Sequence, residues 1–407
     1  MSRPDYYKFL SSRANLIEPS PIREMVSKIA VKSKTRQVIS FAAGEPDPDV
    51  IPRELYAELS SELFRKIRII GNYSPADGVI DLKNEIAGFM KEFDGITTSP
   101  ENIVVTLGGS QAIDLIGRLL LDPGDIVLTE NPSYVNTLLV WRHYGVQIHG
   151  VPMDDQGLIP EELEKALSKL SKEGKKVKLL YTIPTGQNPS GLTLAPERRK
   201  HVLEIASKYD ILVVEDTAYN HLLYEPIDVK TLRSMDKEGR VLYVGSFSKV
   251  LGTGLRIGWL EAPPEIIEKA KMAKGPMDMC PPVPMQYLVL EVLRNKVFKH
   301  VKEKAIETYR LKRDLMIKAI ESYLPGIKYT RPVAGMFVLI WLPRGIMAAQ
   351  FTEALLEKYD VAAIPATPFY TDESGRSVVR LNFSMAKTEL IDEGIRRIGE
   401  LLKELTA

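Results

Sequence analysis

The chain has 407 residues, more than the roughly 250–300 residues that one hydrophobic core serves, so we expect two domains, one of them large. Hydrophobic residues make up 44% of the chain and charged residues 26%, which is ordinary for a globular protein. The formal net charge of +1 gives no reason to expect nucleic acid or a membrane surface as a partner.

Cysteine, histidine and hydropathy exclude several kinds of site. Cys280 is the only cysteine, so no intrachain disulfide or CxxC metal site can form, and we expect it to be a small buried residue. The five histidines show no HExxH spacing, and no metal is expected. The N-terminal segment has no apolar signal core, and no run approaches the ~20 apolar residues of a spanning helix. We therefore expect a cytoplasmic protein, and the scarcity of Cys with abundant Lys and Glu fits a thermophile.

The first expected element in chain order is a helix in EPSPIREMV (18–26). Pro21 suits the first turn of a helix, with Ser20 as its cap. Arg23 then falls in that first turn, where the helix dipole disfavours a cation. A solvent-facing arginine is one interpretation of this position.

In the middle of the chain, short apolar segments rich in Val, Ile and Leu alternate with amphipathic ones. This alternation predicts βα units and a mostly parallel sheet, on which ligands bind at the carboxyl ends of the strands. The expected strands lie within 102–109, 125–130, 177–184, 211–219, 240–249 and 256–263, and the expected helices within 110–121, 132–144 and 196–210.

The pattern changes from about Pro281. A long helical region is expected to reach about Tyr323, followed by strands within 327–343, 361–370 and 378–385 and by a final helix at 388–406. This is an α+β layout, typical of a smaller C-terminal domain. We expect an N-terminal arm or part of the small domain at 1–40, a large domain at 41–290 and a small domain at 291–407.

Lys249 lies in the segment SFSKVLGTGLRIGW (246–259), among hydroxyls, glycines and Arg256. LGGSQAI (107–113) places small residues at a strand end and opens a helix, whose first amides and dipole favour a phosphate. A plain tight turn would explain that segment equally well. Ser246, Ser248 and Arg256 add two hydroxyls and a guanidinium, which also suit phosphate oxygens. The GTGLRIG spacing is not that of a dinucleotide-binding loop.

Three other expected strand ends carry polar or aromatic residues. Asp216 ends a buried strand in VVEDTAY (213–219), either as a helix cap or as the partner of a buried cation. Asn188 lies in PTGQNPSG (184–191), as a turn residue or as a ligand-binding amide. Tyr134 ends NPSY (131–134), where it could stack on a flat ligand. A phosphate, a ring nitrogen, a phenolic oxygen, a flat face and an aldehyde for Lys249 together describe pyridoxal 5′-phosphate (PLP).

With these segments, the chain resembles the fold-type I PLP-dependent aminotransferases of class I. It is most similar to the group of 2-aminoadipate (LysN-type) and kynurenine aminotransferases. The resemblance covers essentially the whole chain, and it is specific because seven segments occur in the family's order. These are YSPADG, GGSQAI, NPSY, QNPSG, EDTAY, SFSKVLGTGLRIGW and VRLNFS. The expected fold is therefore α/β, with a large domain of mostly parallel sheet flanked by helices and a smaller α+β domain.

The resemblance implies a role for each matching residue. Lys249 would bind the cofactor covalently and then act as general base, Asp216 would pair with the ring nitrogen, and Tyr134 would stack on the ring. Asn188 and Tyr219 would bind the phenolic oxygen. The phosphate would be held by Ser110, Gln111, Ser246, Ser248 and Arg256, and by Tyr73 from the other subunit of a homodimer with shared active sites. Arg380, Asn188 and the backbone of Gly44 would bind the substrate α-carboxylate.

The substrate is less sharply defined. In the resembled group a segment matching EPSPIREMV lies over the active site, and its arginine can meet a distal carboxylate or swing aside. We therefore expect Arg23 to favour 2-aminoadipate or glutamate, with breadth toward aromatic or large apolar amino acids, and 2-oxoglutarate as acceptor in a ping-pong reaction. An aromatic or kynurenine aminotransferase is the alternative, and a PLP-dependent lyase on the same fold is a further one. A PLP-sensing regulator is not expected, since fewer than forty residues precede VISFAAGEPDP and they show no helix-turn-helix pattern.

Overall fold

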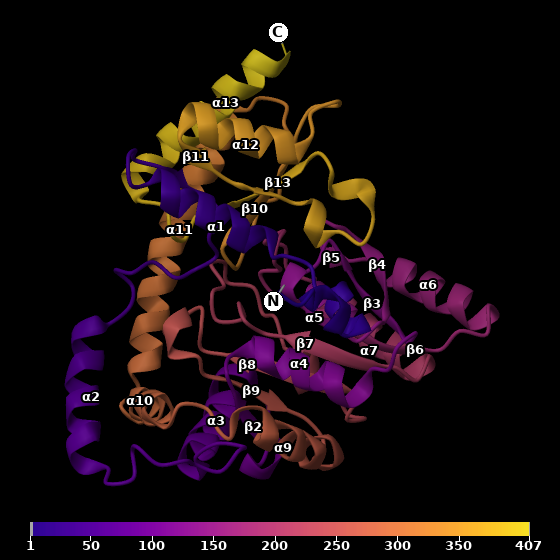
Figure 1. The fold of residues 1–407 in the computed structure, drawn as a ribbon, viewed down its shortest axis with the longest axis vertical. Helices are drawn as coiled ribbons and strands as arrows, with labels where there is room; N and C mark the ends of the chain where they lie inside the picture. Colours follow the sequence, from indigo (N-terminus) through magenta and orange to yellow (C-terminus); the bar gives the residue numbers. More distant parts are fainter. Residues whose placement is uncertain (1–2, 407) are drawn as a thin grey trace.

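A computed structural model describes residues 3–406 of the chain, and its centre is an eight-stranded sheet (Figure 1). The strand order is β2-β9-β8-β7-β6-β3-β4-β5. The four neighbouring pairs from β8 to β4 are parallel, and the pairs at the two edges are antiparallel. The strands are β2 (Ile103–Thr106), β3 (Ile126–Asn131), β4 (Gln147–Asp154), β5 (Gly157–Leu158), β6 (Val177–Thr182), β7 (Leu212–Asp216), β8 (Val241–Ser246) and β9 (Gly258–Glu261). The predicted α/β fold with a mostly parallel sheet is confirmed.

Helices cover both faces of this sheet, because alternate residues of each strand point to opposite sides. Leu180 and Val213 belong to a hydrophobic cluster with α6 and α7, whereas Tyr181 and Val214 belong to one with α4 and α5. The helices of this part are α3 (Ile80–Asp94), α4 (Gly109–Leu120), α5 (Val135–Arg142), α6 (Pro160–Lys172), α7 (Pro196–Lys208), α8 (Leu232–Met235), α9 (Pro264–Asp278) and α10 (Val283–Arg294).

The ends of these helices follow from their sequences. Pro160, Pro196 and Pro264 each open a helix, where the missing amide hydrogen costs nothing. Gly95 ends α3 in the left-handed region, with φ of 69°, which glycine adopts without a Cβ clash.

The C-terminal part is built around a second, antiparallel sheet. Its strand order is β10-β13-β12, and helices α12 and α13 cover it in the upper part of Figure 1. The long helix α11 (Val297–Tyr323) runs from the region of the large sheet to this part. The remaining elements are β10 (Phe337–Trp341), α12 (Ala348–Tyr359), β11 (Val361–Ala362), β12 (Ile364–Pro365), β13 (Val378–Asn382) and α13 (Ile391–Thr406), with single 3₁₀ turns at η3 (Pro100–Asn102), η4 (Thr253–Leu255), η5 (Thr367–Phe369), η6 (Glu373–Gly375) and η7 (Thr388–Leu390).

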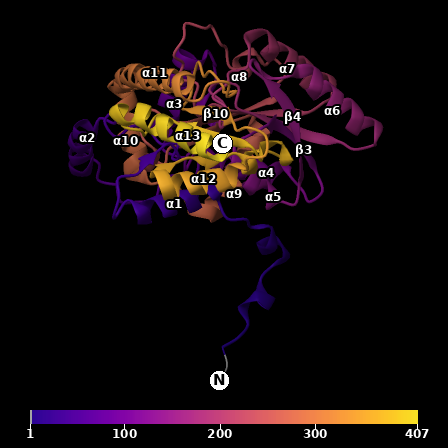
Figure 2. The ribbon, with the colours of Figure 1, turned by 90° about the horizontal axis from the view of Figure 1, so that it is seen from above.

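The N-terminal segment packs on the C-terminal part. β1 (Ile39–Ser40) pairs in parallel with β11, and Met25 of α1 (Pro21–Lys32) shares a hydrophobic cluster with Leu356 and Ile364. Before α1, two 3₁₀ turns, η1 (Tyr6–Phe9) and η2 (Ser12–Leu16), extend away from the body of the molecule (Figure 2). Helix α2 (Arg53–Lys66) lies at the opposite side from α6 and α7.

Four local expectations need correction. Ser20 stands at the N-cap of α1, but its hydroxyl makes no capping hydrogen bond. The long helical region is broken at Lys296, whose φ of 56° lies in the left-handed region and separates α10 from α11. Only residues 337–341 of the segment 327–343 form a strand, because the chain before them makes turns. Cys280 is partly exposed, since it lies in the connection between α9 and α10 rather than inside an element.

Within residues 3–406, no helix is both long enough and apolar enough to cross a membrane.

Candidate active site

A cavity with about 560 Å³ of empty space, including its mouth, opens at the carboxyl ends of the parallel strands. Asp216 ends β7, Ser246 ends β8, and Ser110 lies in the first turn of α4. The predicted site residues among its lining are Ser110, Tyr134, Asn188, Asp216, Tyr219, Ser246, Ser248, Lys249 and Arg256. The sheet thus brings residues separated by almost 150 positions to one place.

Lys249 lies in the turn after β8, with its amine inside the cavity. Its Nζ donates a hydrogen bond to the carbonyl oxygen of Gly44 at 2.8 Å and lies 5.9 Å from the centre of the Tyr219 ring. Burial lowers the pKa of Lys249 to about 8; the charge of Glu45 opposes this shift, and that of Arg380 adds to it. A substantial fraction of this amine is therefore neutral near pH 7.5, unlike that of a surface lysine.

Asp216 carries the buried carboxylate of the site, only 5% exposed. Its Oδ2 accepts a hydrogen bond from the Tyr181 hydroxyl at 2.7 Å, and its Oδ1 accepts one from the amide of Ala218 at 3.2 Å. Burial raises the pKa of Asp216, while these two hydrogen bonds and the Lys249 charge lower it. The two hydrogen bonds thus fix both oxygens of a buried carboxyl group in the cavity lining.

A second group of residues around the cavity suits an anion. Gly108 precedes α4 with φ of 72°, and a Cβ on it would lie 2.9 Å from the Arg256 guanidinium, so only glycine leaves this space open. The Ser246, Ser248 and Ser110 side chains line the same cavity. Arg256 donates to two backbone carbonyls, of Thr253 at 3.1 Å and Leu107 at 2.6 Å, and to no carboxylate within residues 3–406. The first-turn amides of α4 add the positive end of the helix dipole.

Arg380 of β13 lies next to the cavity as a buried cation, 1% exposed. Its Nη1 donates to Asn188 Oδ1 at 3.1 Å and its Nη2 to the Ala42 carbonyl at 2.7 Å, while Nε has no partner in the described chain. The guanidinium carbon lies 4.6 Å from the centre of the Phe337 ring and 5.0 Å from that of Phe369. Burial lowers the pKa of Arg380 to about 10, so it remains a cation at neutral pH.

A profile of the family described as "Aminotransferase class I and II" matches residues 36–398. The chain belongs to this family. It is an aminotransferase, and the resemblance drawn from the seven sequence segments is confirmed at the level of the family and the fold.

Three relatives show how close the likeness is. Aromatic-amino-acid aminotransferase 1 of Thermococcus litoralis is 40% identical over 98% of this chain and 95% of its own length. The 2-aminoadipate transaminase of Thermus thermophilus is 35% identical over 97% and 96%. The crystal structure of an archaeal alanine:glyoxylate aminotransferase is 48% identical, with a TM-score of 0.97 over 98% of this chain and all of that one.

Asn188 joins two parts of the aminotransferase cavity. Its Nδ2 donates to the Tyr219 hydroxyl at 3.3 Å, and its Oδ1 accepts from Arg380. Asn188 is 4% exposed and Tyr219 is 3% exposed. Tyr219 also contacts the Phe337 ring edge to face, at 5.6 Å between ring centres.

Five predicted residues lie outside the cavity lining: Arg380, described above, and Gln111, Gly44, Tyr73 and Arg23. The Gln111 side chain is turned to the Leu107 amide and to Asp278, at 2.9 and 2.7 Å, so in this structure it does not face the cavity. Gly44 lies at the cavity through its carbonyl, which Lys249 contacts. Tyr73 is 78% exposed, and Arg23 is exposed on α1. Their proposed contacts with the partner subunit and the substrate stay predictions.

Three aromatic residues of the site were not predicted from the sequence: Tyr181, Phe337 and Phe369. Tyr181 belongs to the strand segment VKLLYTIP, in which the pattern predicts a tyrosine to be a core residue. Phe337 and Phe369 flank Arg380 from β10 and from the turn after β12. A buried arginine on a strand makes aromatic neighbours a reasonable expectation. The sequence does not indicate which aromatic residues these are.

Proposed function

We propose that this aminotransferase uses PLP to move an amino group between an L-amino acid and a 2-oxo acid in two half-reactions. The observation that carries the proposal is the pairing of a buried, easily deprotonated Lys249 with a buried Arg380 that has no carboxylate partner in the described chain. The first suits a nucleophile and general base, and the second suits the α-carboxylate that every amino acid substrate brings.

The residues of the cavity fit PLP. Ser110, Ser246, Ser248 and Arg256 surround a space that is kept open by Gly108, which suits the phosphate. Asp216 offers an anion at the other end for the ring nitrogen, and Tyr134 an aromatic face. Asn188 and Tyr219 are proposed to bind the phenolic oxygen. When bound, PLP supplies an aldehyde that reacts with amines and a protonated ring that withdraws electrons from the substrate Cα.

Lys249 is proposed to hold and move the proton. Nζ of Lys249 would accept the Cα proton, since its pKa of about 8 leaves a substantial fraction of this amine neutral near pH 7.5. Burial also excludes bulk water, which would exchange with that proton. Asp216, held by Tyr181 and Ala218, would supply the negative charge that stabilises the protonated ring nitrogen.

Arg380 and Asn188 are proposed to orient the substrate. Nε of Arg380 has no hydrogen-bond partner among residues 3–406, which costs free energy in a buried site unless a ligand supplies an acceptor. The two phenylalanine rings hold the guanidinium plane, so that a carboxylate can meet it in a defined orientation.

The enzyme is proposed to act as a homodimer in which Tyr73 serves the partner's cofactor. Tyr73 is 78% exposed, which is a poor place for an aromatic ring in a monomer. The N-terminal arm adds exposed Tyr7, Phe9 and Ile17, and it projects from the body (Figure 2).

The proposed donors are 2-aminoadipate and glutamate, with aromatic or large apolar amino acids also accepted and 2-oxoglutarate as acceptor. The Thermus thermophilus and Thermococcus litoralis relatives support this range by their names. Alanine with glyoxylate is the second candidate, because the 48% identical solved structure is titled as an alanine:glyoxylate aminotransferase.

A donor panel tests the substrate proposal. We would measure kcat/KM for 2-aminoadipate, phenylalanine, kynurenine and alanine, each with 2-oxoglutarate and with glyoxylate, and for glutamate with glyoxylate, on the wild type and on Arg23→Ala. The proposal expects acidic donors to lead and to lose roughly tenfold in Arg23→Ala, with phenylalanine unaffected. Alanine leading with glyoxylate would favour the second candidate, and an equal effect on all donors would remove Arg23 from the site.

A further inference from the structure

The Tyr181 hydroxyl and the Asp216 carboxylate meet across two strands. Tyr181 of β6 pairs in register with Val214 of β7, and Asp216 follows two residues later on the same face of the sheet. A diagonal pair of this kind lies within the reach of a tyrosine side chain. The resulting hydrogen bond is 2.7 Å long and wholly buried, with Tyr181 0% exposed.

Packing fixes the position of this hydroxyl. The Tyr181 ring contacts the Trp141 ring edge to face, at 5.5 Å between centres and 78° between planes. Together with the Ala218 amide, Tyr181 occupies one acceptor position on each oxygen of Asp216, so the carboxylate plane is set from two sides. Each oxygen keeps a further lone pair for a ligand.

The charge on Asp216 depends on few neighbours. Lys249, from the turn after β8, and the Tyr181 hydroxyl favour the anion, and burial opposes it. Tyr134 and Tyr219 face it as neutral phenols, with pKa values raised by burial. Glu130 of β3 carries a buried carboxyl, whose pKa is raised to about 7 by burial and, to a lesser extent, by the charge of Asp216. Once Lys249 is bonded to the cofactor, the Ala218 amide and the Tyr181 hydroxyl would remain as donors to Asp216, and Tyr181 supplies the side-chain donor of the two.

We propose that Tyr181 is a positioning residue for the cofactor ring: its hydroxyl orients Asp216 and keeps it anionic, so that the ring nitrogen is held in its protonated form. This inference rests on the proposed function. Tyr181 itself need not touch the cofactor, since it acts through Asp216.

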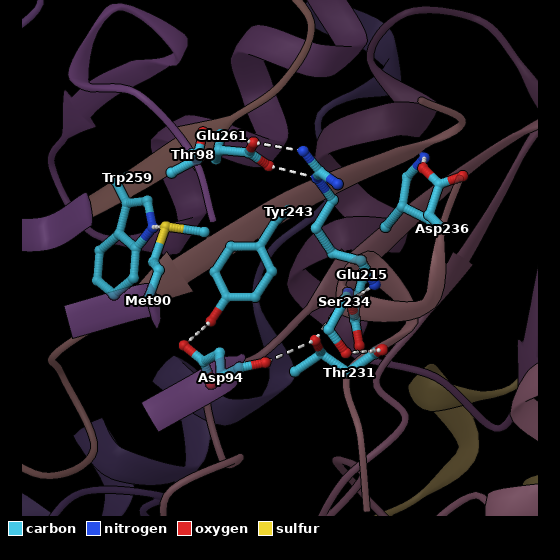
Figure 3. A network of polar contacts seen from close by, with 12 residues as sticks. Met90, Asp94, Thr98, Glu215, Thr231, Ser234, Asp236, Tyr243, Trp259 and Glu261 are labelled. Carbon is cyan, nitrogen blue, oxygen red and sulfur yellow. Dashed lines mark hydrogen bonds and ion pairs between the residues drawn. The ribbon is translucent and has the colours of Figure 1, made fainter. Parts of the chain in front are cut away.

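The same sheet offers a matched control. Tyr243 of β8 is also 0% exposed and also donates to a buried aspartate, Asp94 Oδ2, at 2.8 Å (Figure 3). Neither Tyr243 nor Asp94 lines the cavity. Tyr243→Phe therefore removes a hydroxyl–carboxylate hydrogen bond of nearly equal length from the same fold, away from the cofactor.

The experiment measures the affinity of apo-protein for pyridoxamine 5′-phosphate, which cannot bond to Lys249 and so reports on the ring and phosphate contacts alone. The dissociation constant is taken from tryptophan fluorescence at about pH 6 and about pH 8.5, for wild type, Tyr181→Phe and Tyr243→Phe. Circular dichroism is recorded on each variant to check that it is folded.

For Tyr181→Phe we expect the dissociation constant to rise roughly tenfold at the lower pH and less at the higher pH. The sign follows because loss of the donor raises the pKa of Asp216, so more of it is protonated at low pH, and the deficit shrinks as pH rises. Tyr243→Phe should match the wild type within about twofold at both values. In an Asp216→Asn background, Tyr181→Phe should have no further effect.

The outcomes separate the two proposals. A wild type that binds neither this ligand nor PLP would overturn the proposed function. The role of Tyr181 alone would be overturned if the wild type binds the ligand and Tyr181→Phe binds it with the same affinity. It would also be overturned if Tyr181→Phe weakens the affinity equally at both pH values and in the Asp216→Asn background.

Discussion

Lys249 owes its chemistry to its surroundings rather than to its own structure. A free lysine side chain has a pKa of about 10.4 and is almost entirely protonated near neutral pH. Burial of Lys249 beside the Arg380 and Arg256 cations lowers its pKa to about 8, and the Glu45 and Asp216 charges only partly oppose this. The cavity therefore holds a reactive amine before any ligand arrives.

The rate of covalent PLP uptake should report this pKa. We predict that the rate rises with pH, with a midpoint near the value of about 8 given for Lys249, because only the neutral amine attacks the aldehyde. Stopped-flow absorbance on apo-protein between about pH 6 and pH 9.5 measures it. A rate still rising steeply at the upper limit would show an unperturbed lysine. Lys249→Ala should give no uptake at any pH.

The same lowered pKa affects folding. The unfolded chain binds more protons than the native apo-protein between about pH 8 and the ordinary lysine pKa of 10.5, so Lys249 makes the native state more stable as pH rises through this window. In urea denaturation of apo-protein, Lys249→Met should therefore gain more stability at about pH 7 than at about pH 10. A difference of the opposite sign would contradict the assignment.

Arg380 is a residue that a lysine cannot replace. It lies between Phe337 and Phe369 and uses its planar group for Asn188 and Ala42. We predict that Arg380→Lys lowers kcat/KM for amino acids by roughly a hundredfold, since a charged, two-point contact is lost. The affinity for pyridoxamine 5′-phosphate should change little, which steady-state kinetics and fluorescence titration together can check. Equal loss of both would show a folding defect instead.

At the scale of elements, α11 fixes the loop after β1 that reaches Lys249. Lys312 of α11 is 3% exposed and forms an ion pair with Asp47 at 2.5 Å; it also donates to the Ser384 carbonyl at 2.8 Å. Tyr309 of the same helix accepts from the Asp47 amide. The loop so held presents Gly44 to Lys249 and Ala42 to Arg380.

Loss of the ion pair between Lys312 and Asp47 should destabilise the protein more than loss of a surface ion pair would. We predict that Lys312→Met lowers the free energy of unfolding by about 3–5 kcal/mol, because Asp47 is left buried without a counter-charge. Denaturant unfolding measures this loss. Lys28→Met, which removes an exposed pair with Glu353, is the control and should cost less than about 1 kcal/mol. Adding Asp47→Asn to Lys312→Met should restore part of the loss, and no recovery would contradict the account.

The sequence predicts an element best where the element depends on interactions between residues that are close in the chain. The buried central strands β7 and β8 begin with the apolar runs LVV and VLYV, and their expected positions agree with the structure. β4 escaped sequence analysis because its residues QIHGVPMD alternate poorly and are mostly half-exposed. The contact of Tyr181 with Asp216 depends on the register between β6 and β7, which no local pattern encodes.

In the site, too, features that depend on the local sequence could be predicted, and features that depend on distant residues could not. Lys249, Asp216 and Arg256 could be predicted because their segments match a family in order and spacing. The direction of the Gln111 side chain could not, since it depends on Asp278 at the end of α9, 167 residues away. The domain boundaries and the individual roles of the site residues remain predictions.

At the scale of the whole molecule, the proposed homodimer would give the exposed aromatic residues a place to pack. Tyr73, Tyr7 and Phe9 are each at least 70% exposed. They lie on the loop after α2 and on the arm, outside the cavity lining of their own chain. Association of two chains would bury this apolar area.

Mixed dimers test whether Tyr73 acts across the interface. Lys249→Ala and Tyr73→Ala homodimers should each be impaired. When the two chains are mixed, one site of the hybrid contains Lys249 and receives an intact Tyr73 from its partner. We therefore predict that the purified hybrid regains about half the wild-type rate. A hybrid no more active than Tyr73→Ala would mean that Tyr73 serves its own chain.

The most direct test of the central claim is the absorption spectrum of the PLP-loaded protein before and after an amino donor is added. We predict a yellow protein whose visible band disappears when L-2-aminoadipate, or another donor of the panel, is added without an acceptor, and returns when 2-oxoglutarate follows. Lys249→Ala should show neither the original band nor turnover. A wild type that forms no visible band, or one whose band survives every donor, would contradict an aminotransferase that acts through Lys249.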